Sequence, residues 1–185
     1  GAFHLVCDAT SETAVAELRR RKRRDAQPFA VLVHDMPAAE AIAVLDEEAR
    51  AHLQSPAHPI VLAPSRGAVL APGVNGPSRR TGVMLPYSPL HPLLARGVAR
   101  PLVVTSGNAS GAPTVIAHNE AFAALGSLVD AFLLHDRPIA RRVEDSVVSD
   151  GRVVRRARGF APSPIRLPVA APEPVLAVGG HMKST

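Results

Sequence analysis

The residues with the clearest chemical potential are basic. The run from Arg19 to Arg24 lies at the end of a predicted helix and contains Lys22, one of only two lysines among 21 basic residues. Lysine carries a compact charge on a flexible stem, whereas arginine is a planar fork. Lys22 and Arg24 stand two positions apart where the helix passes into a turn, so both can reach one phosphate chain. A solvated helix end or a nucleic-acid patch is the alternative interpretation.

A second candidate is the segment from Thr105 to Gly111, which follows the apolar strand 101–104. Its small residues let the backbone approach a ligand, and Ser106 and Asn108 offer a hydroxyl and an amide. Ligands bind beyond the carboxyl ends of strands in open α/β sheets. The segment is not a Walker loop, because no Gly-Lys-Ser/Thr follows it. A plain turn is the alternative.

The third candidate joins two segments near the C-terminal end, 141–148 and 155–159. Arg156 and Arg158 are two residues apart on a predicted strand, so both side chains are expected on one face of it, toward the same cleft. Glu144 and Asp145, just before Ser146, hold Mg²⁺ in one interpretation and pair with the arginines in the other. Surface ion pairs of the second kind contribute little energy.

Other catalytic arrangements find little support. Cys7 is the only cysteine, so the chain offers neither an internal disulfide nor a cysteine-based zinc site. The eight histidines include no His-x-x-x-His pair. His91 and His135 stand beside loops of the presumed cleft and are the histidines of most interest.

The composition fits one basic globular domain. The chain has 185 residues and a formal charge of +5, which suits anionic partners. Aromatic residues make up 3%, which disfavours a stacking platform for single-stranded nucleic acid. No apolar run approaches about 18 residues and no signal peptide is recognisable, so we expect no membrane span and a cytoplasmic location.

Strands alternate with helices along the chain, which predicts an α/β fold with an open, twisted, mixed sheet flanked by helices. Helices are expected at 11–24, 38–54 (with a break), 89–95 and 118–125, and an irregular loop with short strand pieces at 64–81. Strands are expected at 3–7, 29–34, 59–63, 82–85, 102–105 and 131–135, with a hairpin of 146–149 and 153–156 around Asp150-Gly151.

The sequence predicts three parts. Residues 1–161 form the nucleotide-binding domain, and its first residues start inside an element. Residues 162–174 contain five prolines and are expected to be an extended linker. Residues 175–185 look like a new strand and a glycine-containing turn, the start of another domain. The chain is therefore expected to be a piece of a longer protein.

The motifs together resemble one family. Lys22-x-Arg24 followed by Ser106-x-Asn108 resembles the nucleotide-binding signature of the YrdC/TsaC family. Longer strings resemble the YrdC-like domain of HypF, the carbamoyltransferase of [NiFe]-hydrogenase maturation, namely residues 3–9, 21–30, 82–91, 105–108, 135–139, 145–148 and 155–162. The last residues resemble the start of the TsaD-like domain that follows in HypF. Gln27 departs from the family, which commonly has lysine there.

The resemblance implies a YrdC-like fold with a basic concave cleft and a defined reaction. ATP and carbamate, the latter released from carbamoyl phosphate, would form carbamoyl-adenylate with Mg²⁺, and the carbamoyl group would pass to the C-terminal cysteine of HypE. Lys22 and Arg24 would be catalytic. The implied nucleotide-binding residues are Lys22, Arg24, Ser106, Asn108, Ser146, Arg156 and Arg158.

Three other functions remain open at this stage. One is threonylcarbamoyl-adenylate synthesis, as in TsaC itself. A second is a module that binds RNA, including double-stranded RNA, whose affinity would fall steeply with salt and ignore ATP. The third is an antibiotic-type O-carbamoyltransferase, which the order of the two domains disfavours.

Overall fold

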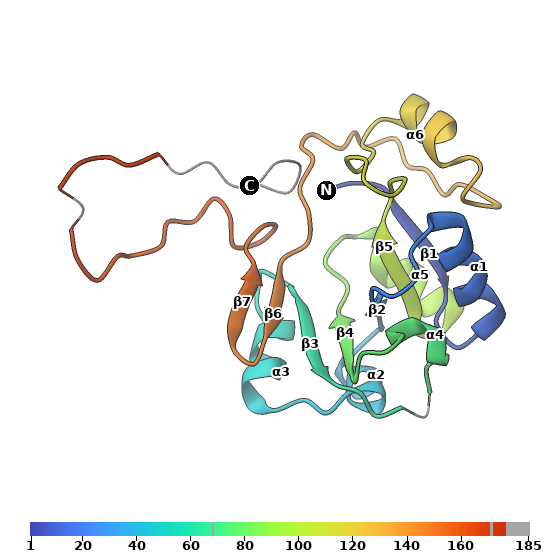
Figure 1. The fold of residues 1–185 in the computed structure, drawn as a ribbon, viewed down its shortest axis with the longest axis horizontal. Coiled ribbons are helices and arrows are strands. Elements are labelled where there is room, and N and C mark those ends of the chain that lie inside the picture. The colour runs from blue at the N-terminus through green and yellow to red at the C-terminus, as the bar shows by residue number, and fades with distance from the viewer. Residues whose placement is uncertain (68, 171, 177–185) are drawn as a thin grey trace.

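The computed structural model describes residues 1–67, 69–170 and 172–176, which form one mixed sheet with helices on both faces (Figure 1). The strand order is β1-β5-β2-β4-β3-β6-β7. β2 pairs with β4, and β3 with β6, in parallel, while the other neighbours are antiparallel. The predicted α/β class and mixed sheet are confirmed. The strands are β1 (His4–Asp8), β2 (Ala30–Leu32), β3 (Ile60–Pro64), β4 (Arg80–Met84), β5 (Leu102–Ser106), β6 (Val147–Ser149) and β7 (Arg152–Arg155).

The helices begin where the sequence provides caps. Ser11, Asp35 and Asp46 each accept a hydrogen bond from a backbone N–H of the first turn of the helix that follows. The Asp46 cap explains why the predicted helical stretch 38–54 is two helices, as its expected break required. The helices are α1 (Glu12–Lys22), α2 (Met36–Ile42), α3 (Glu47–Gln54), α4 (Pro72–Asn75), α5 (Leu90–Val98) and α6 (His118–Leu125).

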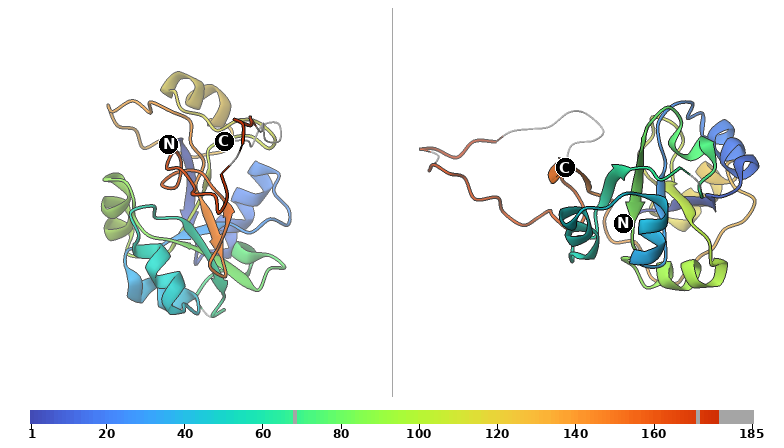
Figure 2. Two further views of the ribbon diagram at one scale, coloured as in Figure 1. Left: turned by 90° about the vertical axis from the view of Figure 1, so that its left-hand side faces the viewer. Right: turned by 90° about the horizontal axis from the view of Figure 1, so that it is seen from below.

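Alternation along the strands gives the sheet two different faces. The larger core lies on one face, where Val31, Val83 and Val103 pack with residues of α1, α2, α3, α4 and α6. On the other face Leu32, Met84, Leu102 and Val104 form a smaller cluster, against which Leu94 of α5 packs. The left view of Figure 2 shows α5 on one side of the sheet and α1 on the other. The single helix α5 leaves part of the second face uncovered.

Two sequence predictions were wrong in detail. Residues 131–135 are not a strand, because no sheet ladder among the described residues includes them. The segment is held by packing instead, since Phe132 lies against Phe122 of α6 with 4.8 Å between ring centroids. The loop 64–81 has strand residues at its ends, with Ser65 bridged to Ala43, but it also contains the short helix α4, which was not predicted.

Beyond β7 the chain leaves the sheet. The described residues from 164 to 176 are exposed and include no helix or strand, and they run away from the domain (Figure 1). The linker 162–174 stays a prediction. The predicted start of a further domain covers residues 175–185, and its part from residue 177 onward lies outside the described residues.

Gly107 closes the junction between β1 and the end of β5. Its N–H donates to the carbonyl of Phe3 at 2.7 Å, and its own carbonyl accepts from Val115 at 2.8 Å. A Cβ at this position would stand 2.6 Å from the carbonyl oxygen of Phe3. Only glycine lets the two backbones approach so closely.

We therefore expect Gly107→Ala to lower the free energy of unfolding by about 1–3 kcal/mol, as overpacking does. Gly97→Ala is the matched control. Gly97 is exposed near the end of α5, and its added Cβ would meet no atom within 4 Å. That change should leave stability equal or raise it by up to about 1 kcal/mol. Urea unfolding of both variants measures the difference, and equal stabilities would contradict the close approach.

Candidate functional site

A cleft of about 210 Å³ lies on the face of the sheet that α5 only partly covers. Register explains its floor. Ala30 of β2 pairs with Val104 of β5 and Gly82 of β4, and Gly82 pairs with Leu62 of β3. Paired residues share a face, so their side chains form one row across the sheet. Every strand contributes to this row or its ends: His4, Ser106, Val104, Ala30, Gly82, Leu62, Ile60, Val147 and Arg155.

The middle of the floor is flat and apolar because its residues are small. A Cβ on Gly82 would stand 3.1 Å from Ile60 Cγ2 and 3.5 Å from Ala30 Cα, so it would fill the floor. Leu62 and Val104 flank this place. A planar ring fits such a surface, with charged groups left to the two ends of the cleft.

Arg24 stands at one end, where its guanidinium is held from several sides. It donates to Thr105 Oγ1 at 3.1 Å and to the carbonyl of Pro28 at 2.6 Å, and it lies 5.0 Å from the Phe29 ring centroid. Burial, together with repulsion from Arg19 and Arg155, lowers the pKa of Arg24. The repulsion from Arg155 indicates two cations that face one shared space, which favours an anion between them.

Arg19 holds the turn that presents Arg24. Its guanidinium donates to the carbonyls of Arg24 and Gly73, both at 2.7 Å, and lies 4.5 Å from the Phe29 ring centroid. Helix α1, which contains Arg19, is capped at its C-terminal end by Arg23, whose backbone lies in the left-handed region with a φ of 50°. Arg19 therefore fixes the backbone of Arg24 relative to α4.

Lys22 joins the end of α1 to the loop after β5. Its side chain is buried, and Nζ donates to the carbonyls of Ser106 and Asn108 and to Asn108 Oδ1, the last at 3.0 Å. Ser106 Oγ donates to the same amide oxygen at 2.7 Å. The structure thus brings together three of the sequence-predicted residues, and places Arg24 next to them through Thr105.

Arg155 occupies the other end of the cleft, a place that the sequence analysis gave to Arg156 and Arg158. The β6–β7 hairpin explains the difference. A regular ladder around Asp150-Gly151 would pair Val147 with Val154, but a register shift pairs it with Arg155. One extra residue in β7 turns every later side chain to the opposite face. The two expected arginines also lie beyond the strand, which ends at Arg155.

The three remaining predicted residues support the wall of the cleft instead of lining it. Ser146 is fully buried, where its hydroxyl donates to the carbonyl of Arg158 and accepts from the N–H of Ala157, both at 2.8 Å. Arg156 donates to the carbonyls of Phe160 and Ser163. Arg158 donates to the carbonyls of Ala57 and His58.

The carboxylates of the cleft pair with arginines, one of the two interpretations drawn from the sequence. Asp145 accepts from Arg158 Nε at 2.9 Å, and Glu144 lies 3.7 Å from Arg155. Burial raises the pKa of Asp145, but His4 and Arg158 outweigh it and hold that pKa below its usual range. Within the described residues no group of three or more His, Cys, Asp or Glu gathers to hold a metal.

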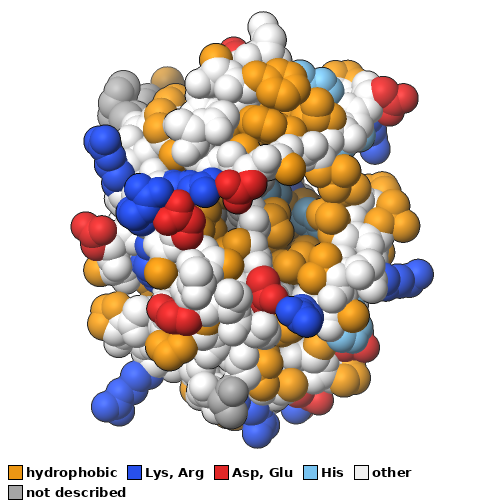
Figure 3. Space-filling view, turned by 90° about the vertical axis from the view of Figure 1, so that its right-hand side faces the viewer, with side chains coloured by type: hydrophobic (Ala, Val, Ile, Leu, Met, Phe, Trp, Pro, Cys, Tyr) orange, Lys and Arg blue, Asp and Glu red, His pale blue; other side chains and the backbone are white. Residues whose placement is uncertain are grey.

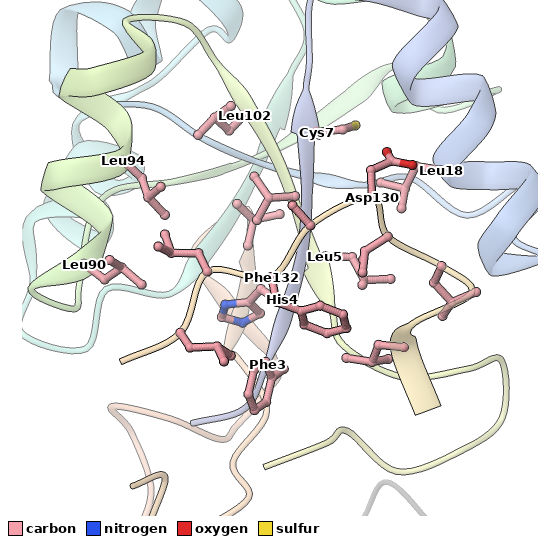
Figure 4. A pocket seen from close by; sticks show the side chains of 18 of the residues that line it. Phe3, His4, Leu5, Cys7, Leu18, Leu90, Leu94, Leu102, Asp130 and Phe132 are labelled. Carbon is pink, nitrogen blue, oxygen red and sulfur yellow. The ribbon is translucent and has the colours of Figure 1, made fainter. Parts of the chain in front are cut away.

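A second cavity, of about 480 Å³, surrounds the edge strand β1 (Figure 3). Its wall is mainly apolar, with Leu5, Leu18, Leu94 and Phe132 among the lining residues (Figure 4). Burial raises the pKa of Cys7, which also lines it, to about 11, so this thiol stays protonated. The cavity holds none of the seven predicted site residues.

The cleft thus has an apolar floor between Arg24 and Arg155, and of the seven sequence-predicted residues Arg24 and Ser106 line it. A family model named Sua5_yciO_yrdC and described as telomere recombination matches residues 1–157. The chain belongs to the Sua5/YciO/YrdC family. No helix among the described residues is long and apolar enough to cross a membrane.

Within the Sua5/YciO/YrdC family the chain is similar to part of several longer proteins. It is 50% identical to carbamoyltransferase HypF of Rhodobacter capsulatus, over all of this chain but 25% of that protein. It is 42% identical to HypF of Synechocystis, with the same coverage. A crystal structure of full-length HypF in the phosphate- and nucleotide-bound form matches with a TM-score of 0.86 and 43% identity, over 91% of this chain and 27% of that one. The chain thus spans about a quarter of the length of these relatives.

Sequence reasoning missed Arg155, His4 and the positioning role of Arg19. Arg155 faces the cleft because of a register shift between β6 and β7, and no turn residue in the sequence predicts that shift. The position of His4 opposite Ser106 follows from the pairing of β1 with β5, which a strand pattern alone does not specify. Arg19 stood within the basic run, and only its contacts separate it from the exposed Arg20.

His91, suspected from the sequence, lines the apolar cavity around β1 and not the cleft, and it lies against Tyr87 with ring centroids 4.4 Å apart. It is buried, and its Nδ1 has no hydrogen-bond partner within the described residues. Burial, together with the nearby His4, lowers the pKa of His91 from 6.5 to about 4. His91 is therefore neutral in the folded protein at pH 7.

The unfolded chain binds a proton at this histidine below pH 6.5, while the folded protein does not until about pH 4. His91 should therefore make the free energy of unfolding fall as the pH drops through that window. We expect His91→Gln to flatten the stability profile between these pH values, and the exposed His34→Gln to leave it unchanged. Urea unfolding at several pH values measures the profiles. Parallel curves for wild type and His91→Gln would refute the buried neutral state.

Proposed function

We propose that the cleft binds ATP and joins its α-phosphate to carbamate, giving carbamoyl-adenylate and pyrophosphate. The observation that carries the proposal is the pair of cations, Arg24 and Arg155, at opposite ends of a flat apolar floor. The Lys22–Ser106–Asn108 cluster beside Arg24 supports it. In this proposal the adenine ring lies over Ala30 and Gly82.

The four residues of the signature, Lys22, Arg24, Ser106 and Asn108, bind the triphosphate. Arg24 reaches the phosphates directly, while Lys22 holds the 106–108 loop and adds positive charge beneath it. Arg155 stands at the opposite end of the floor, on the other side of the adenine. Ser146, Arg156 and Arg158 act on the nucleotide by holding the backbone of residues 157–163 and the carboxylate of Asp145.

The reaction needs positioning and charge more than proton transfer. Carbamate is already an anion, so one of its oxygens attacks the α-phosphorus without a general base. The bond between the α-phosphorus and the bridging oxygen breaks, and pyrophosphate leaves with that electron pair. Fixed cations stabilise the charge that builds up on the leaving group.

Mg²⁺ fits this site only as a companion of the nucleotide. It is usually held by one or two carboxylates together with substrate phosphates. Glu144, on the wall of the cleft, is the carboxylate in position to assist, because its contact with Arg155 is long, at 3.7 Å, whereas Asp145 accepts a hydrogen bond from Arg158 at 2.9 Å. The ion would neutralise phosphate charge there.

The larger activity follows from the relatives. The HypF proteins are named carbamoyltransferases, and this chain covers a quarter of their length. We propose that carbamate reaches the cleft from carbamoyl phosphate and that the carbamoyl group passes to the C-terminal cysteine of HypE in the intact protein. The domain then supplies the activation step of [NiFe]-hydrogenase maturation.

The test is ATP–pyrophosphate exchange by the intact polypeptide. We expect exchange with carbamoyl phosphate plus an acylphosphatase, and none with threonine plus bicarbonate. Lys22→Ala should reduce it at least about 100-fold, because a buried charged group with several hydrogen bonds is lost. Arg20→Ala, an exposed change on the same helix, should leave exchange unchanged.

Exchange driven by threonine instead would assign the threonylcarbamoyl reaction. Binding of double-stranded RNA that falls steeply with salt, without any exchange, would assign an RNA-binding role. Full activity of Lys22→Ala would remove Lys22 from the site.

A further inference from the structure

His4 and Asp145 form a pair that the proposed reaction has not yet used. His4 lies on β1 directly opposite Ser106 of β5. Directly opposed residues in an antiparallel pair have Cβ atoms about 5 Å apart and share a face. Both side chains line the cleft, as does Asp145. His4 therefore stands beside the phosphate-binding end.

Asp145 is fixed from behind. Its Oδ1 accepts from Arg158 Nε at 2.9 Å. The guanidinium of Arg158 also donates to the carbonyls of Ala57 and His58 and lies 3.4 Å from the Tyr87 ring centroid. With one oxygen held so firmly, the other, Oδ2, faces His4 Nε2 at 3.7 Å.

This arrangement leaves one side of the imidazole for a ligand. The two ring nitrogens point in different directions, so Nδ1 faces away from Asp145 when Nε2 faces toward it. Within the described residues the polar partner of the His4 ring is Asp145, and the ring is partly exposed. Figure 4 shows its ring on the wall of the apolar cavity, near Phe3 and Phe132.

The groups around His4 leave room for an anion there. Asp145 Oδ2 lies 3.7 Å from its Nε2, and the ring of His91, which is neutral at pH 7, lies 6.0 Å away between centroids. Arg24, Arg155 and Glu144 line the same cleft. Asp145 shares its charge with Arg158, so the nearest carboxylate is already neutralised by an arginine.

We propose that His4, positioned by Asp145, binds the carboxylate of the acyl substrate next to the α-phosphate. The proposal rests on the adenylate-forming function above and names its second anion site. Two anions must meet in that reaction, and Lys22, Arg24 and Arg155 serve the nucleotide. His4 donates a hydrogen bond from Nδ1 to the planar carboxylate. Asp145 is a positioning residue and does not touch the substrate.

The experiment compares variants of the intact polypeptide in two separate measurements. Isothermal titration calorimetry gives the affinity for ATP alone, and exchange at varied carbamoyl phosphate, with excess acylphosphatase, gives the apparent KM for the acyl substrate. His4→Ala should raise that KM about 10- to 100-fold, as expected for a lost charged hydrogen bond, and leave ATP affinity within about twofold. The exposed His34→Gln is the control and should change neither value.

Conservative variants separate binding from folding. His4→Gln keeps a donor of similar size and should recover part of the lost affinity. Asp145→Asn should raise the same KM less than His4→Ala does, because the ring keeps its donor and loses only the carboxylate that positions it.

The outcomes distinguish this proposal from the function on which it rests. Absence of exchange by the wild-type protein, with either acyl substrate, would overturn the adenylate-forming function itself. Wild-type exchange with an unchanged KM in His4→Ala would overturn the role of His4 alone. An equal loss of ATP affinity would also overturn it, because His4 would then serve the nucleotide. If exchange were driven by threonine plus bicarbonate and His4→Ala raised the KM for threonine, His4 would still bind the acyl substrate, but that substrate would not be carbamate.

Discussion

The structure depends on a buried lysine. Lys22 carries its ammonium group into the protein at the end of α1, where water is largely excluded, and such a charge is tolerated only with several acceptors around it. Three oxygens of Ser106 and Asn108 meet that need. The same bonds tie residues 84 and 86 positions apart in the chain, so the requirement of one charge fixes the loop that closes the cleft.

The sheet provides the floor of the cleft. One row of paired residues crosses the strands and sets an apolar floor between two cationic ends. Small residues at Ala30 and Gly82 keep that floor flat, and the close contact of Gly107 with Phe3 holds β1 beside β5. His4 owes its place opposite Ser106 to that pairing. Backbone geometry thus decides which side chains meet.

Much of this arrangement could be read from the sequence. Caps, apolar runs and the Asp150-Gly151 turn predicted most elements, because they act over a few residues. The family signature groups Lys22 with Ser106 and Asn108, so it predicted that these residues belong to one site. Residues 131–135 misled because an apolar run fits both a strand and a segment packed on a helix, and only a hydrogen-bonded neighbour decides between them.

The sequence did not show which arginine lines the far wall of the cleft, because strand pairing decides this too. Arg155, Arg156 and Arg158 are chemically equal, and a one-residue register shift in β7 selects among them. Such a shift depends on how both strands fit the rest of the sheet. The supporting contacts of Arg19 and Arg158 are likewise long-range, and nothing in the local pattern marks them.

The central claim is that nucleotide binds across the sheet, between Arg24 and Arg155. A crystal structure of the protein with a non-hydrolysable ATP analogue tests it most directly. The account predicts the adenine over Ala30 and Gly82, with the phosphates against Arg24 and the 106–108 loop. Nucleotide in the apolar cavity around β1, away from Arg24, would contradict it.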